Sequence, residues 1–308
     1  MISEKLYQEI EALGFRMQTF KIEHLKEISE DFRILAEKGL LDAEFYRRYL
    51  AEFCYDHTGV LEGAKSVIVI AGPQGINHGV FEHEGRTVTA VIPPTYMYPV
   101  INDNIADILN KVLKEKGYSF ARPALPLKLL AVRSGLGRYG RNNVCYVPGL
   151  GSFIRLSAYI TDYEFEEDSW GEIKALESCS SCTACIDNCP TGAIDRDRFL
   201  IHAHNCITHF NECAAPIPEW INPQWHNSLV GCMKCQAACP HNAKLIDKVD
   251  EKICFDEVET GLILGGSTFD SLPEETRRKL VHIGMESYYD VLARNIRLLE
   301  SAGTVSAD

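Results

Sequence analysis

The chain has 308 residues, of which 46% are hydrophobic and 24% charged, and its formal net charge at pH 7 is −12. This length suits one large domain or two ordinary ones, and the composition is that of a globular protein. The acidic balance argues against a nucleic-acid partner, because phosphate binding relies on clustered Lys and Arg. The sequence has neither a secretory signal nor about 18 consecutive apolar residues, so we expect a cytoplasmic protein with no membrane partner.

In chain order, the first fifty residues are predicted to be helical, because their apolar residues recur at helical spacing. Residues 66–70 form a β-branched run that ends before Gly72 and Pro73, and residues 87–92 form another that ends before two prolines. Both runs predict strands. A helix is expected over residues 102–116, where Gly117 can terminate it.

Strand signals return at residues 127–132 and 153–160. After the cysteine-rich region the sequence favours helix, notably from Pro273 onward and over residues 288–299. The predicted fold class is therefore α+β. We expect an α/β cofactor domain over residues 1–170, a metal-binding domain over 171–245 and a helical C-terminal tail over 246–308.

Cysteine is concentrated in one part of the chain. Nine of the twelve cysteines lie between Cys179 and Cys239, whereas Cys54, Cys145 and Cys254 are scattered. In an unexported chain, this number of cysteines indicates metal or redox chemistry before disulfides. The three scattered cysteines are interpreted as small buried apolar side chains.

The spacing of the clustered cysteines predicts two [4Fe–4S] clusters in a ferredoxin-type module between about residues 178 and 242. The first run is C-x-x-C-x-x-C-x-x-x-C-P from Cys179 to Cys189, and the second is C-x-x-C-x-x-x-C-P from Cys232 to Cys239. In two-cluster ferredoxins the cysteine before the proline ligates the other cluster. Cys206 can supply the position that the second run lacks.

Exchange of the fourth ligands gives each cluster four thiolates. The first cluster is expected to use Cys179, Cys182, Cys185 and Cys239, and the second to use Cys206, Cys232, Cys235 and Cys189. Cys213 is then spare. A structural zinc site is the alternative interpretation, but zinc needs only four ligands and explains neither eight matched cysteines nor two Cys-Pro endings.

Gly135, Gly137 and Gly140 match G-x-G-x-x-G after a predicted strand. A dinucleotide fold also needs a following helix and an acidic residue about 20 positions on. Here helix breakers such as Pro148 follow, and the nearest downstream acid is Asp162. Close backbone approach to some other cofactor fits the segment better, because glycines and adjacent asparagines offer amide donors with little bulk.

Taken together, these features resemble the epoxyqueuosine reductases, which are cobalamin-dependent iron–sulfur enzymes of queuosine tRNA modification related to reductive dehalogenases. The resemblance covers roughly residues 1–300. It rests on residues 131–143 and 149–152, on the cysteine runs, and on residues 205–208 and 215–218 between them. It implies a nitroreductase-like α/β cobalamin-binding domain followed by a double-cluster ferredoxin-like domain.

The resemblance also implies a corrinoid that is bound without a histidine ligand to cobalt. In agreement, the chain has no Asp-x-His-x-x-Gly pattern. Flavin is the weaker alternative for the same domain. The residues that the resemblance assigns to the cofactor are Gly135, Gly137, Gly140, Arg141, Asn142, Asn143 and Ser152.

Two departures from the family pattern bear on function. Counting back from Gly135, Ala121 occupies the position of the family's catalytic aspartate, so the catalytic residue is unknown. Tyr96, Tyr98 and Tyr139 could donate protons, although packing roles are expected for them. The chain also ends soon after residues 292–297, about where the family's tRNA-engaging helical repeats would start. We therefore expect no tRNA partner.

Two functions of different class remain open. The chain could be an enzyme that passes electrons through the clusters to a bound corrinoid for a reductive reaction other than epoxyqueuosine reduction. Alternatively, it could be an electron-transfer or activating protein that reduces the corrinoid or another redox cofactor of a partner. Reduced ferredoxin or flavodoxin is the expected electron donor, and the acceptor would be a small molecule or a corrinoid protein.

Overall fold

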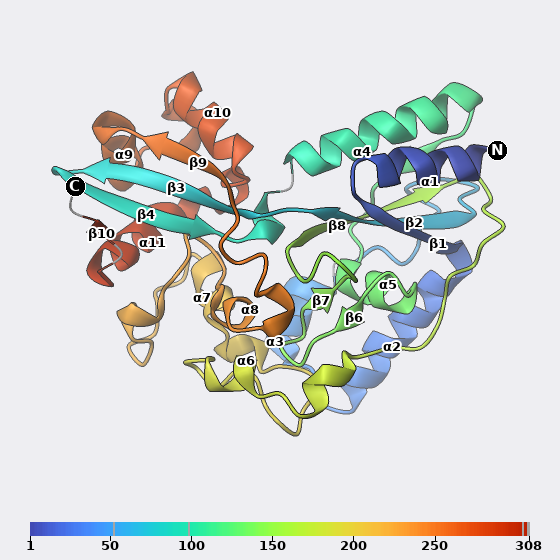
Figure 1. The fold of residues 1–308 in the computed structure, drawn as a ribbon, viewed down its shortest axis with the longest axis horizontal. Helices are drawn as coiled ribbons and strands as arrows, with labels where there is room; N and C mark the ends of the chain where they lie inside the picture. The colour runs from blue at the N-terminus through green and yellow to red at the C-terminus, as the bar shows by residue number, and fades with distance from the viewer. Residues whose placement is uncertain (52, 98, 304, 307–308) are drawn as a thin grey trace. The chain divides into compact units, whose positions relative to one another are not determined.

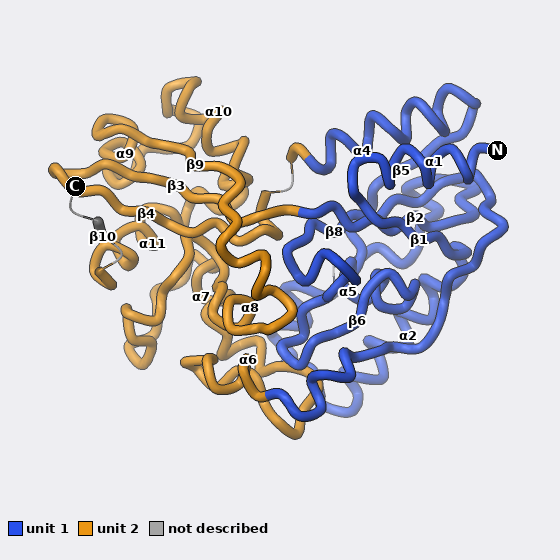
Figure 2. The backbone as a smooth tube through the Cα atoms, in the orientation of Figure 1, with its two compact units in different colours: residues 1–73, 101–182 blue, residues 74–100, 183–308 orange. Residues whose placement is uncertain are grey.

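The computed structural model describes residues 1–51, 53–97, 99–303 and 305–306. These residues form two compact units, one of residues 1–73 and 101–182 and the other of residues 74–100 and 183–308 (Figure 2). The division differs from the three consecutive segments expected from sequence, because the hairpin of residues 76–92 pairs with a strand from the C-terminal part of the chain. Tyr98 lies outside the described residues.

The first unit is built on an antiparallel sheet with strand order β1-β2-β8-β5 (Figure 1). Its strands are β1 (Arg16–Lys21), β2 (Ser66–Pro73), β8 (Ile154–Thr161) and β5 (Phe120–Ala121). The unit's helices are α1 (Ile2–Ala12), α2 (Leu25–Glu37), α3 (Ala43–Phe45), α5 (Leu127–Arg133) and most of α4 (Pro99–Val112).

Helices cover this sheet on both faces. Along β2, Val67 and Val69 belong to the core cluster that includes residues of α2 and α5, whereas Ile68 and Ile70 belong to the cluster that includes residues of α1 and α4. Successive side chains of a strand point to opposite faces, so a sheet covered on both sides needs an unbroken apolar run. The apolar run at residues 66–70, which predicted this strand, is explained by burial of the strand on both faces.

The second unit contains a sheet with strand order β10-β4-β3-β9, in which β3 and β9 are parallel. Its strands are β3 (Ile76–His83), β4 (Arg86–Ile92), β9 (Val249–Phe255) and β10 (Val305–Ser306). Its helices are α6 (Ala184–Asp187), α7 (Ile207–Glu212), α8 (Lys234–Ala237), α9 (Glu257–Leu264), α10 (Glu274–His282) and α11 (Tyr289–Ser301). The core includes Phe81 stacked on Phe255, with ring centroids 4.8 Å apart.

The α+β fold class and the helical C-terminus are confirmed, and so are the strands expected near residues 66–70, 87–92 and 153–160. The strand expected at residues 127–132 is wrong, because these residues form helix α5 after Pro126. Leu, Lys, Ala and Arg favour helix, and the side chains of residues 129–132 are all buried. The expectation of helices alone in the first fifty residues is also wrong, since β1 lies among them.

Of the scattered cysteines, Cys145 is buried as expected, Cys54 is half-buried and Cys254 is exposed on β9. The interpretation of Cys254 as a buried side chain is therefore wrong. Only Ile253 and Phe255 of β9 are buried, because this strand lies at the edge of its sheet and places its other side chains in solvent.

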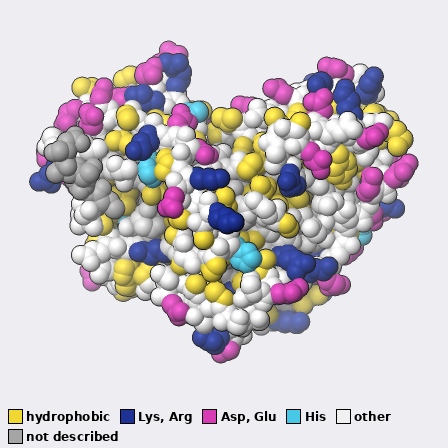
Figure 3. Space-filling model, in the orientation of Figure 1, with side chains coloured by type: hydrophobic (Ala, Val, Ile, Leu, Met, Phe, Trp, Pro, Cys, Tyr) yellow, Lys and Arg dark blue, Asp and Glu magenta, His cyan; other side chains and the backbone are white. Residues whose placement is uncertain are grey.

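No helix in the described part of the chain is long and apolar enough to cross a membrane. Acidic and basic side chains are interspersed on the face drawn in Figure 3, over both units. This distribution agrees with a chain whose net charge is negative but which carries 31 Lys and Arg residues.

Candidate metal centre

The second unit brings together cysteines that are far apart in sequence. Cys206 precedes helix α7, and its thiol is close enough to Cys232 and Cys189 for each to raise its pKa electrostatically. Burial is the larger cause, and it raises the pKa of Cys206 to about 11. Three of the four ligands predicted for the second cluster are therefore neighbours. The fourth, Cys235, lies in helix α8.

The two cysteine runs have similar local structures. Cys185 lies in the one-turn helix α6 and Cys235 in the one-turn helix α8, and these two helices pack against each other. After each helix, the amide of the cysteine before the proline donates to a carbonyl three residues back, at 3.1 Å for Cys189 and 3.3 Å for Cys239. The repeated geometry fits the pseudo-symmetric arrangement that exchange of fourth ligands requires.

Cys179 and Cys182 belong to the first unit, whereas Cys185 and Cys239 belong to the second. No two of the twelve cysteines are joined by a disulfide. Cys213 is buried, and its Sγ lies 3.7 Å from the Nδ1 of His209. Eight half-buried thiols, seven in the two matched runs and one at Cys206 between them, are a donor set whose chemistry fits two cubane clusters. The assignment of Cys213 as the spare cysteine stays a prediction.

Helix α11 holds the two segments that carry Cys206 and Cys232. The guanidinium of Arg294 donates to the carbonyl oxygens of Phe210, Asn211, Cys213 and Ala215 at 2.6–3.4 Å. The next residue, Asn295, donates from Nδ2 to the carbonyl oxygens of Asn211 (2.9 Å) and Leu229 (2.8 Å). The C-terminal helix is thereby part of the framework of the metal site.

The glycine motif forms a tight hairpin in the first unit, between strands β6 (Arg138–Tyr139) and β7 (Cys145–Tyr146). A Cβ at Gly137 would lie 2.5 Å from the Sγ of Cys145, and one at Gly140 would lie 2.5 Å from the ring of Tyr146. Both positions need glycine for the hairpin's own packing. Gly135 has a φ of +74°, and no other group lies within 4 Å of where its Cβ would be.

The other residues assigned to the cofactor by resemblance lie in or just after this hairpin. Asn142 is buried, and its Nδ2 donates to the hydroxyl of Tyr146 (3.0 Å). Asn143 has a left-handed φ of +58° and accepts at its carbonyl from Lys128 Nζ (3.1 Å). Ser152 is buried after the turn that Val147 and Gly151 close.

Arg141 connects the hairpin to the cysteine region. Its Nη2 donates to the carbonyl oxygen of Cys179 at 2.5 Å. The neighbouring backbone is also paired, because Tyr139 and residues 174–176 exchange hydrogen bonds of 2.8 and 2.9 Å. The segment that bears the first predicted cluster ligand is therefore fixed against the glycine-rich hairpin.

Ala121, at the position counted for the catalytic aspartate, lies in strand β5 and pairs with Ile160 of β8. Its side chain is half-buried against the core cluster of α2 and α5. Tyr139 is buried, and burial raises the pKa of its hydroxyl well above the ordinary value for tyrosine. A buried neutral phenol of this kind agrees with the packing role expected for Tyr139.

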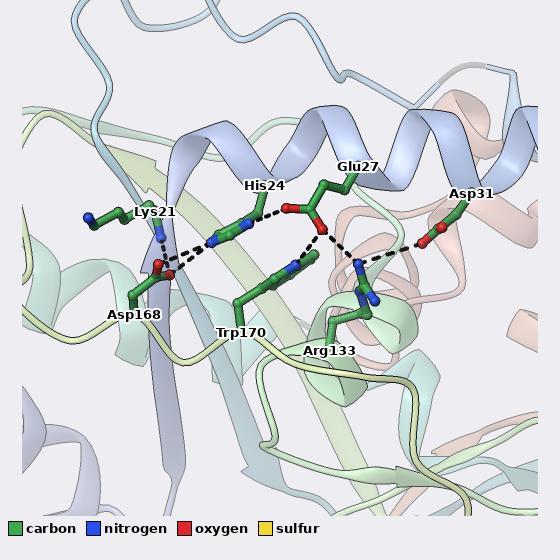
Figure 4. A network of polar contacts seen from close by, with 7 residues as sticks. All are labelled: Lys21, His24, Glu27, Asp31, Arg133, Asp168 and Trp170. Carbon is green, nitrogen blue, oxygen red and sulfur yellow. Dashed lines mark hydrogen bonds and ion pairs between the residues drawn. The ribbon is translucent and has the colours of Figure 1, made fainter.

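A polar network near Arg133 was not foreseen from the sequence (Figure 4). His24 lies between two carboxylates, with Nδ1 2.5 Å from Glu27 Oε1 and Nε2 3.1 Å from Asp168. Glu27 accepts from Trp170 Nε1 and from Arg133 Nη2, both at 2.9 Å. The network joins helices α2 and α5 to the segment that leads into the cysteine region.

The pKa shifts in this network predict how stability depends on pH. Burial opposes the charged form of His24, but its hydrogen bonds to Glu27 and Asp168 outweigh burial and raise its pKa. The contribution of His24 is therefore complete below its unfolded pKa of about 6.5 and is lost as pH rises through the folded value. The hydrogen bonds with His24 and Trp170 lower the pKa of Glu27, whose contribution is lost as pH falls.

We therefore expect the His24→Gln variant to be less stable than the parent near pH 5.5. The expected loss in the free energy of unfolding is only about 1 kcal/mol, because Glu27 is half-exposed and water screens its charge. The difference should shrink above pH 7. Urea unfolding at several pH values measures it, with His204→Gln, an exposed histidine of the second unit, as the control. A stability difference between variant and parent that stays constant from pH 5 to 8 would contradict the claim that protonated His24 stabilises the fold.

A family model described as a 4Fe-4S double cluster binding domain matches residues 178–242. This match agrees with the geometry of the cysteine runs and with the boundaries predicted from sequence. The chain therefore contains a double [4Fe–4S] cluster binding domain and is an iron–sulfur protein of mixed α+β fold.

Sequence comparison finds epoxyqueuosine reductases. The protein of Staphylococcus aureus is 30% identical over 158 residues, which are 51% of this chain and 39% of that protein. The protein of Leadbetterella byssophila is 32% identical over 199 residues, which are 61% of this chain and 62% of that protein. The matched regions thus span about two fifths to three fifths of these relatives.

Structural comparison finds the same fold in an epoxyqueuosine reductase. A structure of epoxyqueuosine reductase from Bacillus subtilis, described as having its catalytic aspartate loop swung out of the active site, has a TM-score of 0.68 at 21% identity and covers 98% of this chain and 81% of that one. The predicted resemblance to the epoxyqueuosine reductases is confirmed by relatives at about 30% identity and by the double-cluster domain, and the structural match shows a shared fold.

Proposed function

We propose that the chain is an oxidoreductase that passes electrons through two [4Fe–4S] clusters to a corrinoid held by the glycine-rich hairpin. The proposed reaction is a reduction other than that of epoxyqueuosine. The observation that carries the proposal is the contact between Arg141 and the Cys179 carbonyl, because it joins the hairpin to the first cluster ligand. Electron transfer from a cluster to a second cofactor needs a fixed, short separation of this kind.

The proposed cofactor residues contribute in different ways. Gly135 and Asn143 have positive φ values and shape the backbone before the hairpin and in its loop, whereas Gly137, Gly140 and Asn142 maintain its packing. Arg141 and Ser152 complete the set assigned by resemblance. A bound corrinoid would supply a cobalt centre that can accept electrons and act on a reducible substrate.

Ala121 supports the proposal of an altered reaction. An alanine methyl group cannot donate a proton, and its strand position fixes it against the hydrophobic core. A reaction that needs an acid at this position would therefore be slow. The same observation suits a chain that reduces the redox cofactor of a partner protein and performs no substrate chemistry itself.

Titration of the anaerobically reconstituted protein with cob(II)alamin tests the corrinoid proposal. We expect a change in the cobalamin absorbance that saturates at one equivalent per chain, and weaker binding by the Arg141→Met variant. A Lys111→Met variant, altered on the far helix α4, is the control. A flat titration with fully loaded clusters would refute the corrinoid site.

A second assay separates the proposed reactions. The loaded protein with reduced flavodoxin is offered a tRNA stem loop that contains epoxyqueuosine. Conversion to queuosine at rates typical of enzymes, about 1 s⁻¹ or more, would refute the proposal of a different reaction. Absence of conversion together with reduction of an added corrinoid protein would favour the activating role.

A further inference from the structure

Asn227 makes a direct contact with a predicted cluster ligand. Its Nδ2 lies 3.3 Å from the Sγ of Cys232, within the range for a hydrogen bond to sulfur, and also donates to the carbonyl of Trp225 (3.0 Å). Its Oδ1 accepts from the amide of Met233 (2.8 Å) and from the hydroxyl of Ser228 (3.0 Å). Both ends of the side-chain amide are therefore engaged.

These partners determine which way the amide of Asn227 faces. The Met233 amide is a donor only, so it must meet the oxygen of the side chain, and the Trp225 carbonyl is an acceptor only, so it must meet the nitrogen. The group directed at Cys232 is consequently an N–H donor.

The matching position in the first cysteine run is occupied by an acidic residue. Cys182 is the counterpart of Cys232, and the residue five positions before Cys182 is Glu177. The Glu177 side chain is 92% exposed and pairs with Arg138. The two runs therefore match in their cysteines but differ in the group placed beside this ligand.

We propose that Asn227 raises the reduction potential of the second cluster, the one ligated by Cys189, Cys206, Cys232 and Cys235. This inference rests on the proposed function, because it assumes that the cluster is bound. An electron added to a cluster increases the negative charge on its sulfur ligands. An N–H donor stabilises that charge, more so where the thiolate is removed from water, and hydrogen bonds to sulfur are a known determinant of cluster potential.

The Asn227 hydrogen bond affects electron flow between the two clusters. A hydrogen bond to a thiolate ligand stabilises the reduced cluster relative to the oxidised one and favours electron flow toward that cluster. Asn227 supplies that bond at Cys232. The two clusters therefore differ in potential by virtue of a residue that lies outside the cysteine pattern.

The Asn227→Asp variant tests this role. It keeps an oxygen that accepts from Met233 but replaces the N–H donor by an oxygen that repels the thiolate. Redox titration followed by electron paramagnetic resonance should show one of the two cluster potentials shifted to a more negative value. The expected shift corresponds to at least a tenfold change in the ratio of reduced to oxidised cluster, about 59 mV for one electron.

Glu177→Gln, the matched change in the first run, should leave the reduction potential of the first cluster unchanged. If Asn227→Asp does not fold, Asn227→Ala also lacks the donor and should shift the potential in the same direction. Unchanged potentials in a fully loaded variant would overturn the inference, and so would selective loss of the second cluster, which would make Asn227 an anchor. A parent protein without clusters would instead refute the proposed function.

Discussion

Replacement of Cys189 by alanine is expected to remove about four of the eight irons that two [4Fe–4S] clusters contain. Although Cys189 belongs to the first run, it lies beside Cys206 together with Cys232 of the second run. The cluster that is lost should therefore be the one held by Cys206, Cys232 and Cys235. Iron and sulfide analysis with electron paramagnetic resonance of the reduced protein measures the loss.

Two further variants make this result specific. The spectrum that remains in Cys189→Ala should match that of Cys232→Ala and differ from that of Cys182→Ala, because only the first two remove ligands of the same cluster. Cys213→Ala is the control within the same region, and it should retain all its iron. A Cys189→Ala spectrum that matches Cys182→Ala would show that each run binds its own cluster.

The Asn295→Leu variant is expected to have a free energy of unfolding about 2–4 kcal/mol lower than the parent and to release iron faster to a chelator. Asn295 is 1% exposed, and leucine would leave the carbonyl oxygen of Leu229 without its donor and that of Asn211 with only the 3.4 Å contact from Arg294. Each buried carbonyl that loses its partner costs about 1–3 kcal/mol. Because these carbonyls flank the segments of Cys206 and Cys232, the second cluster should be released first.

Urea unfolding and the rate of iron transfer to a chelator measure these effects. Ser301→Ala, an exposed change at the end of the same helix, should alter stability by less than about 0.5 kcal/mol. Equal iron release from both variants would show that helix α11 does not support the metal site.

The metal ligands could be predicted from the sequence because their spacing reflects a chemical requirement. A cubane cluster needs four thiolates at fixed geometry, so Cys182 and Cys185 must recur at short intervals, and so must Cys232 and Cys235. The groups around the ligands have no such constraint. Asn295 contacts carbonyls of segments that only folding brings close, whereas Asn227 contacts residues within six positions and belongs to no spacing pattern.

The glycine motif shows a different limit. The pattern at Gly135, Gly137 and Gly140 predicted close approach of a cofactor, and the preceding residues predicted a strand. In the structure, Gly137 and Gly140 accommodate side chains of their own hairpin, and a helix precedes them. A glycine indicates that space is needed, but the sequence does not state what fills the space.

Pairing between distant segments accounts for the strands that the sequence did not predict. Strand β9 is mostly exposed and contains three consecutive charged residues, and only its parallel pairing with β3 makes it a strand. Strand β1 lies between two helices and pairs with β2 about fifty residues later. Local propensity is a weak guide to such elements, because the partner strand provides the stabilisation.

The most direct test of the whole account is the iron and acid-labile sulfide content of the protein purified without oxygen. Two interleaved [4Fe–4S] clusters predict about eight of each per chain and a brown chromophore that bleaches on reduction. One zinc ion per chain with negligible sulfide would contradict the account, and the proposals of electron transfer, of a corrinoid acceptor and of a role for Asn227 would fail with it.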